Sequence, residues 1–417
     1  MNILERQRDK RAGKRIAVVT LGVKLADEVR GYTRFRKVAE MLVRAGYEVD
    51  LITSSFQHWD KAPRDTSREV YRQLPYRVVF IDEPGYSRNL DLHRIYSHRI
   101  AAQNIAQFLR KNKGRYNLIY SEIPPNDMAL ACARFAKSEG IAYVADINDL
   151  WPEAMRMAVN VPVLSDVLFY PFARDARKVY RMLDAAVGTS DEYAVRPSYD
   201  RNKPYPKITV YVGNDLSVFD KGVTEYSSEI TKPEGEVWAT YAGTLGKSYD
   251  IATLVRAACA LKEICPELRI KILGDGPDRK QLEALANKLD APVDFLGYQD
   301  YAHMAAWLAK SDITVNSLVR NAPQSIVTKI GDYLASGHPM INTGSSPEMC
   351  RKTEQDGFGV NVPAEDVDLL AETLGALVKD ADVREKMGYQ ARCIAEEQFD
   401  QEQAYQRIVS LVDGLVH

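Results

Sequence analysis

Short apolar stretches alternate with amphipathic ones along most of this sequence, and this alternation constrains the fold more than any other feature. Residues 16–22 are an apolar run typical of a buried strand, residues 33–44 carry apolar side chains at helical spacing, and residues 47–53 resemble a second strand. This order predicts a βαβ unit, which opens a parallel sheet with helices on its faces.

The alternation occurs in two series, so we expect two domains. A chain of 417 residues exceeds the size at which a single core stops growing, which agrees with two domains of about 200 residues each. We expect an N-terminal domain at 1–220, a C-terminal domain at 221–395, and a C-terminal helix within 396–417 that crosses back to the first domain. The polar stretch 220–235 is the expected linker.

The remaining predicted elements follow the same alternation. In the first series the predicted strands are 76–81, 116–121, 142–147, 185–188 and 209–219, and the predicted helices are 93–112 and 127–138. In the second series the predicted strands are 237–243, 268–273, 293–296, 313–316 and 339–342, and the predicted helices are 251–264, 279–289, 326–336, 365–379 and 381–395. The fold class is therefore α/β with two doubly wound parallel sheets.

Composition indicates a cytoplasmic globular protein. The five cysteines form no CxxC pair, which fits reduced thiols, and the charged N-terminus leads into an apolar run too short for a secretory or transmembrane segment. Residues 1–200 hold 32 Lys and Arg against 25 Asp and Glu (+7), so the remainder of a chain of net charge −2 carries −9. The basic half could meet phosphates, anionic lipid or nucleic acid, but a solvated surface is the favoured explanation of so modest an excess.

Several familiar catalytic strings are absent from the sequence, including Walker A, GxSxG and HExxH. The string GDGPD follows a predicted strand, and its Gly274 and Gly276 allow a ligand to approach the backbone closely, but the third glycine of a dinucleotide fingerprint is missing. Two Asp-x-Asp strings, which begin at Asp366 and Asp380, each open a predicted helix, so capping explains them and no metal site is predicted.

The predicted helix 326–336 carries a cation and a carboxylate close together. Ser325 is its expected N-cap, and Gly337 is its expected left-handed C-terminal residue. Lys329 and Asp332 are three positions apart and share one surface. Such a pair near a helix N-terminus can bind a phosphate through the lysine and a ribose diol through the carboxylate, while the alternative is a surface ion pair.

Polar residues also follow two predicted strands of the first domain, at the edge where such folds bind ligands. Gly31, Arg34 and Arg36 lie in the loop and helix that follow the first strand. Asn148 and Asp149 follow the strand at 142–147, and a turn with an Asp cap is the alternative explanation for them.

The stretch 167–183 places aromatic residues beside a basic helical face. Such a stretch suits a peripheral membrane contact or a lipid-linked substrate. The alternative is a core-packed helix with a basic outer face. The candidate contacts are Phe169, Tyr170, Phe172, Arg174 and Arg177.

Taken together, the motifs YAGTLGKSYDIATLVRA, IKILGDGP, VDFLGY, SDITVNSL and IVTKIGDYLASGHPMI resemble those of the retaining family 4 glycosyltransferases. RGYTRFRKVAEMLVRAGYEVDLITSSFQHW and VADINDLWPEAM in the first half are similar to the bacterial surface-polysaccharide members of that family. The resemblance covers nearly the whole chain. It implies the GT-B fold, in which two Rossmann-like domains face a cleft.

The family's donor-binding pattern carries over residue by residue. Lys329 matches the family lysine that holds the diphosphate, and Asp332 stands where a glutamate usually holds the ribose. Gln324 occupies the position of a second family glutamate. Thr244 replaces an arginine after Gly243, which leaves Lys247 as the nearest cation. In the first domain, Asn148 or Asp149 stands near the position of a family histidine.

The resemblance implies a metal-independent hexosyltransferase without a cofactor, which moves a sugar from a nucleoside diphosphate, with a UDP-sugar as the expected donor, to a lipid-linked or glycan acceptor. The resemblance also implies that the product retains its anomeric configuration, and we expect Lys329, Lys247 and the amides around Gly31 to stabilise the leaving diphosphate. We expect a cytoplasmic location, with a contact at the inner face of the membrane as an option, and no nucleic-acid partner. A sugar-nucleotide epimerase of the same fold and a catalytically inactive assembly partner are the alternatives.

Overall fold

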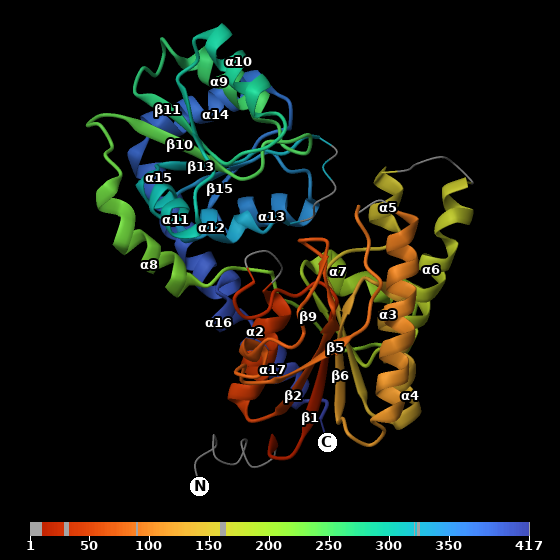
Figure 1. Ribbon diagram of the computed structural model, residues 1–417. Helices are drawn as coiled ribbons and strands as arrows, with labels where there is room; N and C mark the ends of the chain where they lie inside the picture. Colours follow the sequence, from red (N-terminus) through yellow and green to blue (C-terminus); the bar gives the residue numbers. More distant parts are fainter. Residues whose placement is uncertain are drawn as a thin grey trace. The chain divides into compact units, whose positions relative to one another are not determined.

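The computed structural model describes residues 11–28, 33–88, 91–158, 164–320, 322 and 326–416. The chain divides into two compact units, each built around its own sheet (Figure 1). Unit 1 comprises Met1–Tyr211 and Tyr405–His417, and unit 2 comprises Val212–Ala404.

Unit 1 is built on a seven-stranded parallel sheet with the order β5-β2-β1-β6-β7-β8-β9. The central strand β1 (Arg15–Val19) pairs with β2 and with β6, and its residues Ile16–Val19 are fully buried because helices cover both faces of the sheet. The other strands are β2 (Glu48–Ser54), β5 (Arg77–Ile81), β6 (Leu118–Ile123), β7 (Ala142–Ile147), β8 (Ala185–Gly188) and β9 (Lys207–Thr209), and a small hairpin pairs β3 (Phe56–Gln57) with β4 (Ala62–Pro63).

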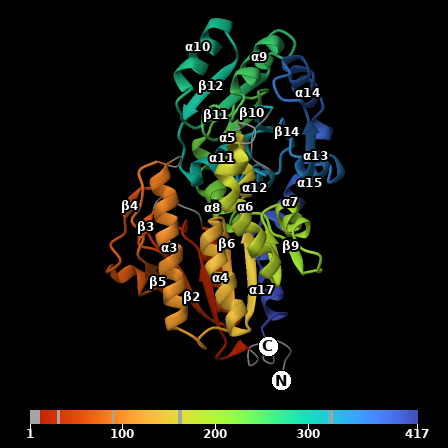
Figure 2. The same cartoon turned by 90° about the vertical axis from the view of Figure 1, so that its right-hand side faces the viewer.

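Three helices of unit 1 lie side by side on one face of this sheet (Figure 2). They are α3 (Leu92–Lys111), α4 (Asn126–Glu139) and α6 (Leu164–Met182), and their small and aliphatic inner residues pack on the strands to form the core of the unit. The remaining helices are α2 (Arg34–Ala45), α5 (Glu153–Ala158), α7 (Asp191–Val195) and α17 (Gln406–Asp413), and the last of these packs on α2.

Unit 2 is built on a six-stranded parallel sheet with the order β12-β11-β10-β13-β14-β15. The strands are β10 (Val237–Ala242), β11 (Leu268–Leu273), β12 (Val293–Gly297), β13 (Ile313–Asn316), β14 (Met340–Asn342) and β15 (Gly359–Asn361). The helices are α8 (Leu216–Tyr226), α9 (Ile251–Leu261), α10 (Arg279–Leu289), α11 (Tyr301–Lys310), α12 (Lys329–Ala335), α13 (Pro347–Gln355), α14 (Val367–Lys379), α15 (Ala381–Ile394) and α16 (Gln401–Ala404). The prediction of two doubly wound parallel sheets is confirmed.

The region between the two predicted domains differs from the expectation. The strand expected over 209–219 ends at Thr209, because Asp215 accepts a hydrogen bond from the Val218 amide and thereby caps α8. The expected linker 220–235 therefore contains most of a helix. This helix packs closely on α11, where a Cβ at Gly222 would lie 2.8 Å from Ala302 Cα. The chain divides after Tyr211 and Ala404, and not at the expected positions 220 and 395.

The helix expected over 326–336 is shorter than predicted. α12 begins at Lys329, and Ser325, its expected cap, lies outside the described residues. Gly337 has the expected left-handed backbone, with φ of 72°, and its amide donates to Leu334 O at 3.1 Å. The short α12 is thus stopped at its C-terminal end by a residue that the sequence identifies.

Candidate functional site

Two glycine-containing turns meet at the carboxyl ends of β10 and β11. A Cβ added to Gly274 would lie 1.8 Å from Gly243 O, and one added to Gly276 would lie 2.1 Å from Leu245 O. Neither approach is available to a residue with a side chain, so the two turns pack backbone to backbone. The Leu245 amide joins them with a hydrogen bond to Asp275 O at 3.0 Å.

The amine of Lys329 lies against the first of these turns. A Cβ on Gly243 would be 2.6 Å from Lys329 Nζ, which also donates to Tyr241 Oη at 3.0 Å. The same nitrogen lies 4.2 Å and 4.0 Å from the ring centroids of Tyr241 and Tyr249. Burial lowers the pKa of Lys329 to about 7. An anion bound at the Gly243 turn would therefore meet an amine that it can hold in the charged form.

Asp332 has partners of its own and forms no ion pair with Lys329. Its Oδ1 accepts hydrogen bonds from Asn214 Nδ2 at 2.9 Å and from Tyr301 Oη at 2.8 Å. Burial raises the pKa of this carboxyl to about 6, and the two hydrogen bonds oppose the rise. The simple surface ion pair considered from the sequence is therefore wrong. Neither Asn214 nor Tyr301 was singled out from the sequence, because both lie far from Asp332 along the chain.

The other candidate donor residues are distributed unevenly. Thr244 and Lys247 lie exposed in the turn that follows Gly243, and the Thr244 carbonyl accepts a hydrogen bond from Tyr241 Oη at 2.8 Å. Gly31 and Gln324 lie outside the described residues. The structure thus brings Gly243, Thr244, Gly274, Gly276 and Lys329 together around the two turns.

Asn148 and Asp149 line a cavity of about 240 Å³ in unit 1, which we call the polar pocket. Asn148 Oδ1 is buried and accepts no hydrogen bond from the described residues. Asp149 accepts from the Leu150 amide at 2.8 Å and from Trp151 Nε1 at 3.1 Å, and burial raises its pKa. Asp149 thus both forms a turn and lines a cavity. The turn considered from the sequence therefore does not exclude a role in ligand binding.

The polar pocket also contains ionisable residues that sequence reasoning missed. Glu122 ends β6 beside β7, and burial raises its pKa to about 7 although Thr20 and the Leu21 amide donate to it. His58 and His98 are neutral at pH 7, because burial lowers their pKa values to about 4 and about 3. The position of Glu122 at the carboxyl end of a strand was the available signal, as it was for Asn148.

Arg34 is buried within unit 1, contrary to the expected membrane contact, while its contact with an acceptor stays a prediction. Its guanidinium is buried, and Nε donates to Asp146 Oδ2 at 2.9 Å while Nη1 donates to Val210 O at 2.9 Å and to Tyr405 Oη at 3.3 Å. A buried cation held in this way cannot reach a membrane. Arg36 is half-buried on α2 and lies 3.5 Å from Glu40.

The aromatic and basic residues of α6 divide between the interior and the surface. Phe169 is buried, and Phe172 packs edge-on against Trp151 with ring centroids 6.2 Å apart. Tyr170 is exposed, with the Arg177 guanidinium 5.8 Å from its ring centroid, and Arg174 pairs with Asp175 at 2.9 Å. Tyr170, Arg174 and Arg177 thus lie at the surface and Phe169 lies inside, and the contact of these residues with an acceptor or a membrane stays a prediction.

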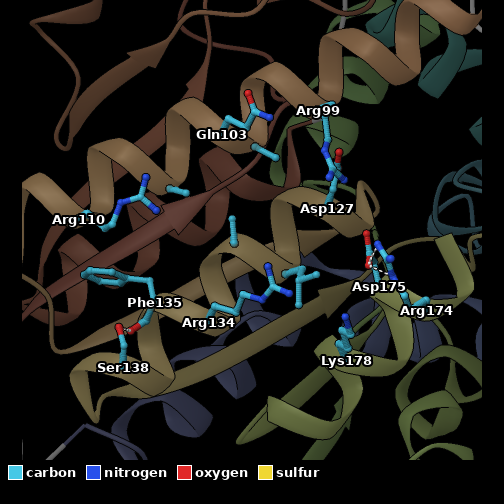
Figure 3. A pocket seen from close by; sticks show the side chains of 14 residues that line it. Arg99, Gln103, Arg110, Asp127, Arg134, Phe135, Ser138, Arg174, Asp175 and Lys178 are labelled. Atoms are coloured by element: carbon cyan, nitrogen blue, oxygen red, sulfur yellow. Dashed lines mark hydrogen bonds and ion pairs between the residues drawn. The ribbon is translucent and has the colours of Figure 1, made fainter. Parts of the chain in front are cut away.

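A groove of about 440 Å³ runs over the outer surfaces of α3, α4 and α6, and we call it the basic groove (Figure 3). Its floor is formed by apolar residues that include Ala102 and Leu130, and its only carboxylates are Asp127 and Asp175. The lining cations are Arg99, Arg110, Arg134, Arg174 and Lys178. The positive charge noted in the first half of the sequence therefore gathers partly on one face of unit 1.

Comparison with known proteins gives matches to both units. Residues 237–380 match the family model described as "Glycosyl transferases group 1". EpsD of Bacillus subtilis (strain 168), which is named as a glycosyltransferase, is 26% identical over an alignment of 188 residues. The match covers 37% of this chain and 49% of EpsD. The alignment thus spans about half the length of that relative.

Two solved structures share the fold over almost the whole chain. Sucrose-phosphate synthase from Thermosynechococcus elongatus has a TM-score of 0.70 at 16% identity, covering 96% of this chain and 99% of that one. HepE of Anabaena in complex with UDP has a TM-score of 0.69 at 14% identity, covering 96% and 100%. HepE has also been solved with UDP-glucose. The fold is GT-B, as the sequence predicted.

Two searches of the described residues found nothing. None of the helices in the described ranges is long and apolar enough to cross a membrane. Among the same residues, no group of three or more His, Cys, Asp or Glu side chains is arranged to hold a metal ion. The matches to known proteins thus support a glycosyltransferase built on the GT-B fold.

Proposed function

We propose that this protein transfers a sugar from a nucleoside diphosphate donor bound on unit 2 to a hydroxyl bound on unit 1. The observation that carries the proposal is the amine of Lys329, which lies against the Gly243 turn where the backbones of two turns meet. A diphosphate needs a cation and closely approachable backbone, and this arrangement offers both. The match of residues 237–380 to group 1 glycosyl transferases also supports this proposal.

The donor nucleotide is proposed to be a UDP-sugar. The fold neighbour HepE has been solved with UDP and with UDP-glucose, which makes uridine the first base to test. In our proposal Lys329 holds the diphosphate and its departing charge, the exposed Lys247 adds a second cation, and Asp332 accepts hydrogen bonds from the ribose. A ribose hydroxyl would then either replace Tyr301 Oη as a hydrogen-bond donor to Asp332 or donate to the carboxylate beside it.

The acceptor is proposed to bind in the polar pocket. Asn148 Oδ1 is a buried acceptor that a substrate hydroxyl can satisfy, and the carboxyl groups of Glu122 and Asp149 line the same cavity. Transfer of a hexose, with retention and without a metal ion, follows the family resemblance. Proton NMR of the product's anomeric signal tests retention, and activity in the presence of EDTA tests metal independence.

Attraction to an anionic membrane is proposed to act through the basic groove. Five cations against two carboxylates leave the groove a net charge of about +3, and each uncompensated cation raises the affinity for anionic lipid headgroups by about 1 kcal/mol near a membrane surface. Flotation with vesicles that contain anionic lipid should capture the wild type. Capture should weaken for the double charge reversal of Arg134 and Lys178, which are both replaced by Glu. Equal capture of both proteins would contradict a role for the groove.

A nucleotide screen by thermal shift tests the donor site. UDP, GDP, ADP and TDP are compared at one fixed concentration. A nucleotide present at about 100 times its dissociation constant would add about 2.7 kcal/mol to the stability of the state that binds it, or about 5–10 °C for a unit of this size. We expect the shift with one nucleotide only, and its loss in Lys329→Ala. Lys262→Ala, which removes an exposed and ion-paired lysine of the same unit, is the control.

The two alternatives considered from the sequence give different results in the same assays. An epimerase would convert the nucleotide-sugar without an acceptor, whereas a transferase consumes the donor productively only when the acceptor is present. A catalytically inactive assembly partner would bind neither the nucleotide nor the nucleotide-sugar, or it would bind them without converting the nucleotide-sugar. Full activity in Lys329→Ala would refute the proposed donor site.

A further inference from the structure

A second cavity of unit 1, of about 460 Å³, lies beside the polar pocket, and we call it the apolar pocket. The N-terminal parts of α3 and α6 form two of its walls, and the segment that leads into α5 forms a third. Its main apolar lining residues are Leu92, Ile95, Met155, Leu168, Phe169 and Phe172. Its volume lies within the range of cavities that hold small organic ligands.

The two pockets are continuous, because Arg94, His98, Asp149 and Trp151 line both. Trp151 forms the boundary between them. Its ring stacks nearly parallel to His98 with centroids 6.1 Å apart, the Arg94 guanidinium lies 5.0 Å from its centroid, and its Nε1 donates to Asp149. A ligand that occupies both pockets must therefore have a polar part and an apolar part on the two sides of this indole.

The polar pocket favours an uncharged head with hydroxyl groups. Three carboxyl groups line it, those of Glu83, Glu122 and Asp149, and its two imidazoles are uncharged at pH 7. Carboxyl oxygens and the buried Asn148 Oδ1 accept hydrogen bonds from hydroxyls. Arg94 is the cation among the lining residues, and its guanidinium lies at the boundary with the apolar pocket, beside the Trp151 ring. The chemistry of the lining thus selects a sugar-like head.

The apolar pocket is lined partly by side chains that remain open to water. Leu168 is 53% exposed and Ile95 is 45% exposed, although both face the cavity. A ligand that covers such a contiguous apolar surface gains about fourfold in affinity for each methylene that it buries. We infer that the apolar pocket holds the hydrocarbon chain of an amphipathic acceptor whose uncharged, hydroxyl-bearing head occupies the polar pocket.

The statement that the acceptor's head receives a sugar rests on the proposed function, whereas the binding of the acceptor's hydrocarbon chain does not. The inference chooses a lipid-linked acceptor over a free glycan, because a free glycan would leave the apolar pocket empty.

Isothermal titration with hexyl, octyl and decyl β-glucoside, each below its micelle concentration, tests the inference with the full-length protein. Affinity of the wild type should rise by up to about 16-fold from hexyl to octyl, and again from octyl to decyl, since each step adds two methylenes. Leu168→Asp and Ile95→Asp, which place a charge on the wall of the pocket, should flatten this dependence on chain length.

Two neighbouring residues provide matched controls. Val167 is 70% exposed and Tyr96 is 59% exposed, and each adjoins a lining residue on the same helix without lining the pocket. Val167→Asp and Tyr96→Asp should keep the chain-length dependence of the wild type. If the control variant loses the chain-length dependence as fully as the lining variant does, for Leu168 with Val167 and for Ile95 with Tyr96, the glucosides adsorb to the apolar surface in general and not to the pocket. In that case the inference fails. Equal affinity of the wild type for hexyl and decyl glucoside would also overturn it.

Titration with UDP-glucose separates this inference from the proposed function. All four variants lie in unit 1, so they should bind UDP-glucose as the wild type does. If the wild type binds decyl glucoside but no nucleotide or nucleotide-sugar, the proposed donor site fails and the lipid pocket stands. If it binds UDP-glucose without any chain-length dependence for the glucosides, the donor site stands and the lipid pocket fails.

Discussion

The lowered pKa of Lys329 predicts that donor binding depends on pH in a defined direction. In the free protein the amine titrates near pH 7, because it is buried against two tyrosine rings. A bound diphosphate favours the charged form and raises this pKa, so binding takes up a proton wherever the free amine is neutral. Affinity should therefore be highest below pH 7 and should fall as the pH rises.

The size of this effect follows from the fraction of charged amine. With a free pKa of about 7 and a bound amine that stays charged, the charged fraction falls from about three quarters at pH 6.5 to about 3% at pH 8.5. The dissociation constant of UDP-glucose should rise about 25-fold over that interval. UDP-glucose is the appropriate ligand, because its diphosphate is esterified at both ends and does not titrate there.

Isothermal titration in two buffers of different ionisation enthalpy measures both quantities. At pH 7 the binding of UDP-glucose should take up about half a proton. Lys329→Arg is the matched control, since a guanidinium stays charged throughout and should give an affinity that does not change with pH. An affinity of the wild type that is constant between pH 6.5 and 8.5 would refute the assigned contact between Lys329 and the diphosphate.

Four further perturbations have defined outcomes. Lys329→Met should raise the free energy of unfolding at pH 7 by on the order of 4 kcal/mol, since it removes the cost of burying the amine; chemical denaturation measures this, and the gain should shrink toward pH 10 as the lysine of the unfolded wild type also begins to lose its proton. Glu122→Gln should become more stabilising between pH 5 and 8, because the native carboxyl, with a pKa raised to about 7, binds protons that the unfolded chain has released; a difference that does not change with pH would contradict this. Arg34→Met should cost about 3–5 kcal/mol by leaving Asp146 buried without its cation, whereas normal stability with lost activity would support the predicted acceptor contact instead. Gly274→Ala should destabilise unit 2 by more than about 2 kcal/mol, whereas Gly235→Ala, which meets no neighbouring atom, should show only the smaller cost of its left-handed backbone in the same thermal scans.

The sequence predicts the sheets of this protein better than the elements between them. β11 and β13 have the predicted bounds, because each is a short apolar run between clear breaks. α11 and α13 were not predicted, and α8 was taken for strand and linker. The acidic or hydroxyl caps of these helices, Asp300, Ser346 and Asp215, are visible in the sequence, but each of the helices is short, 9 to 11 residues.

The candidate site could be located from the sequence only where one local segment makes it. Lys329 and the glycines of the two turns were found because helix and loop signals mark them. The partners of Asp332 could not be found, since Asn214 and Tyr301 reach it from distant segments. The burial of Arg34 could not be found for the same reason, since Asp146, which accepts its hydrogen bonds, lies 112 residues away.

The division of the chain also determines the order in which the units can be completed during synthesis. Unit 2 is one continuous segment inserted between Tyr211 and Tyr405, so a ribosome finishes it before the last part of unit 1 exists. The final helix supplies Asp413, which pairs with Arg11 and accepts from Tyr47 Oη at 2.6 Å, and the residue before that helix supplies Tyr405 Oη to the buried Arg34. A nascent chain that stops near residue 404 would therefore contain a complete unit 2 and a unit 1 whose most deeply buried cation is still partly uncovered.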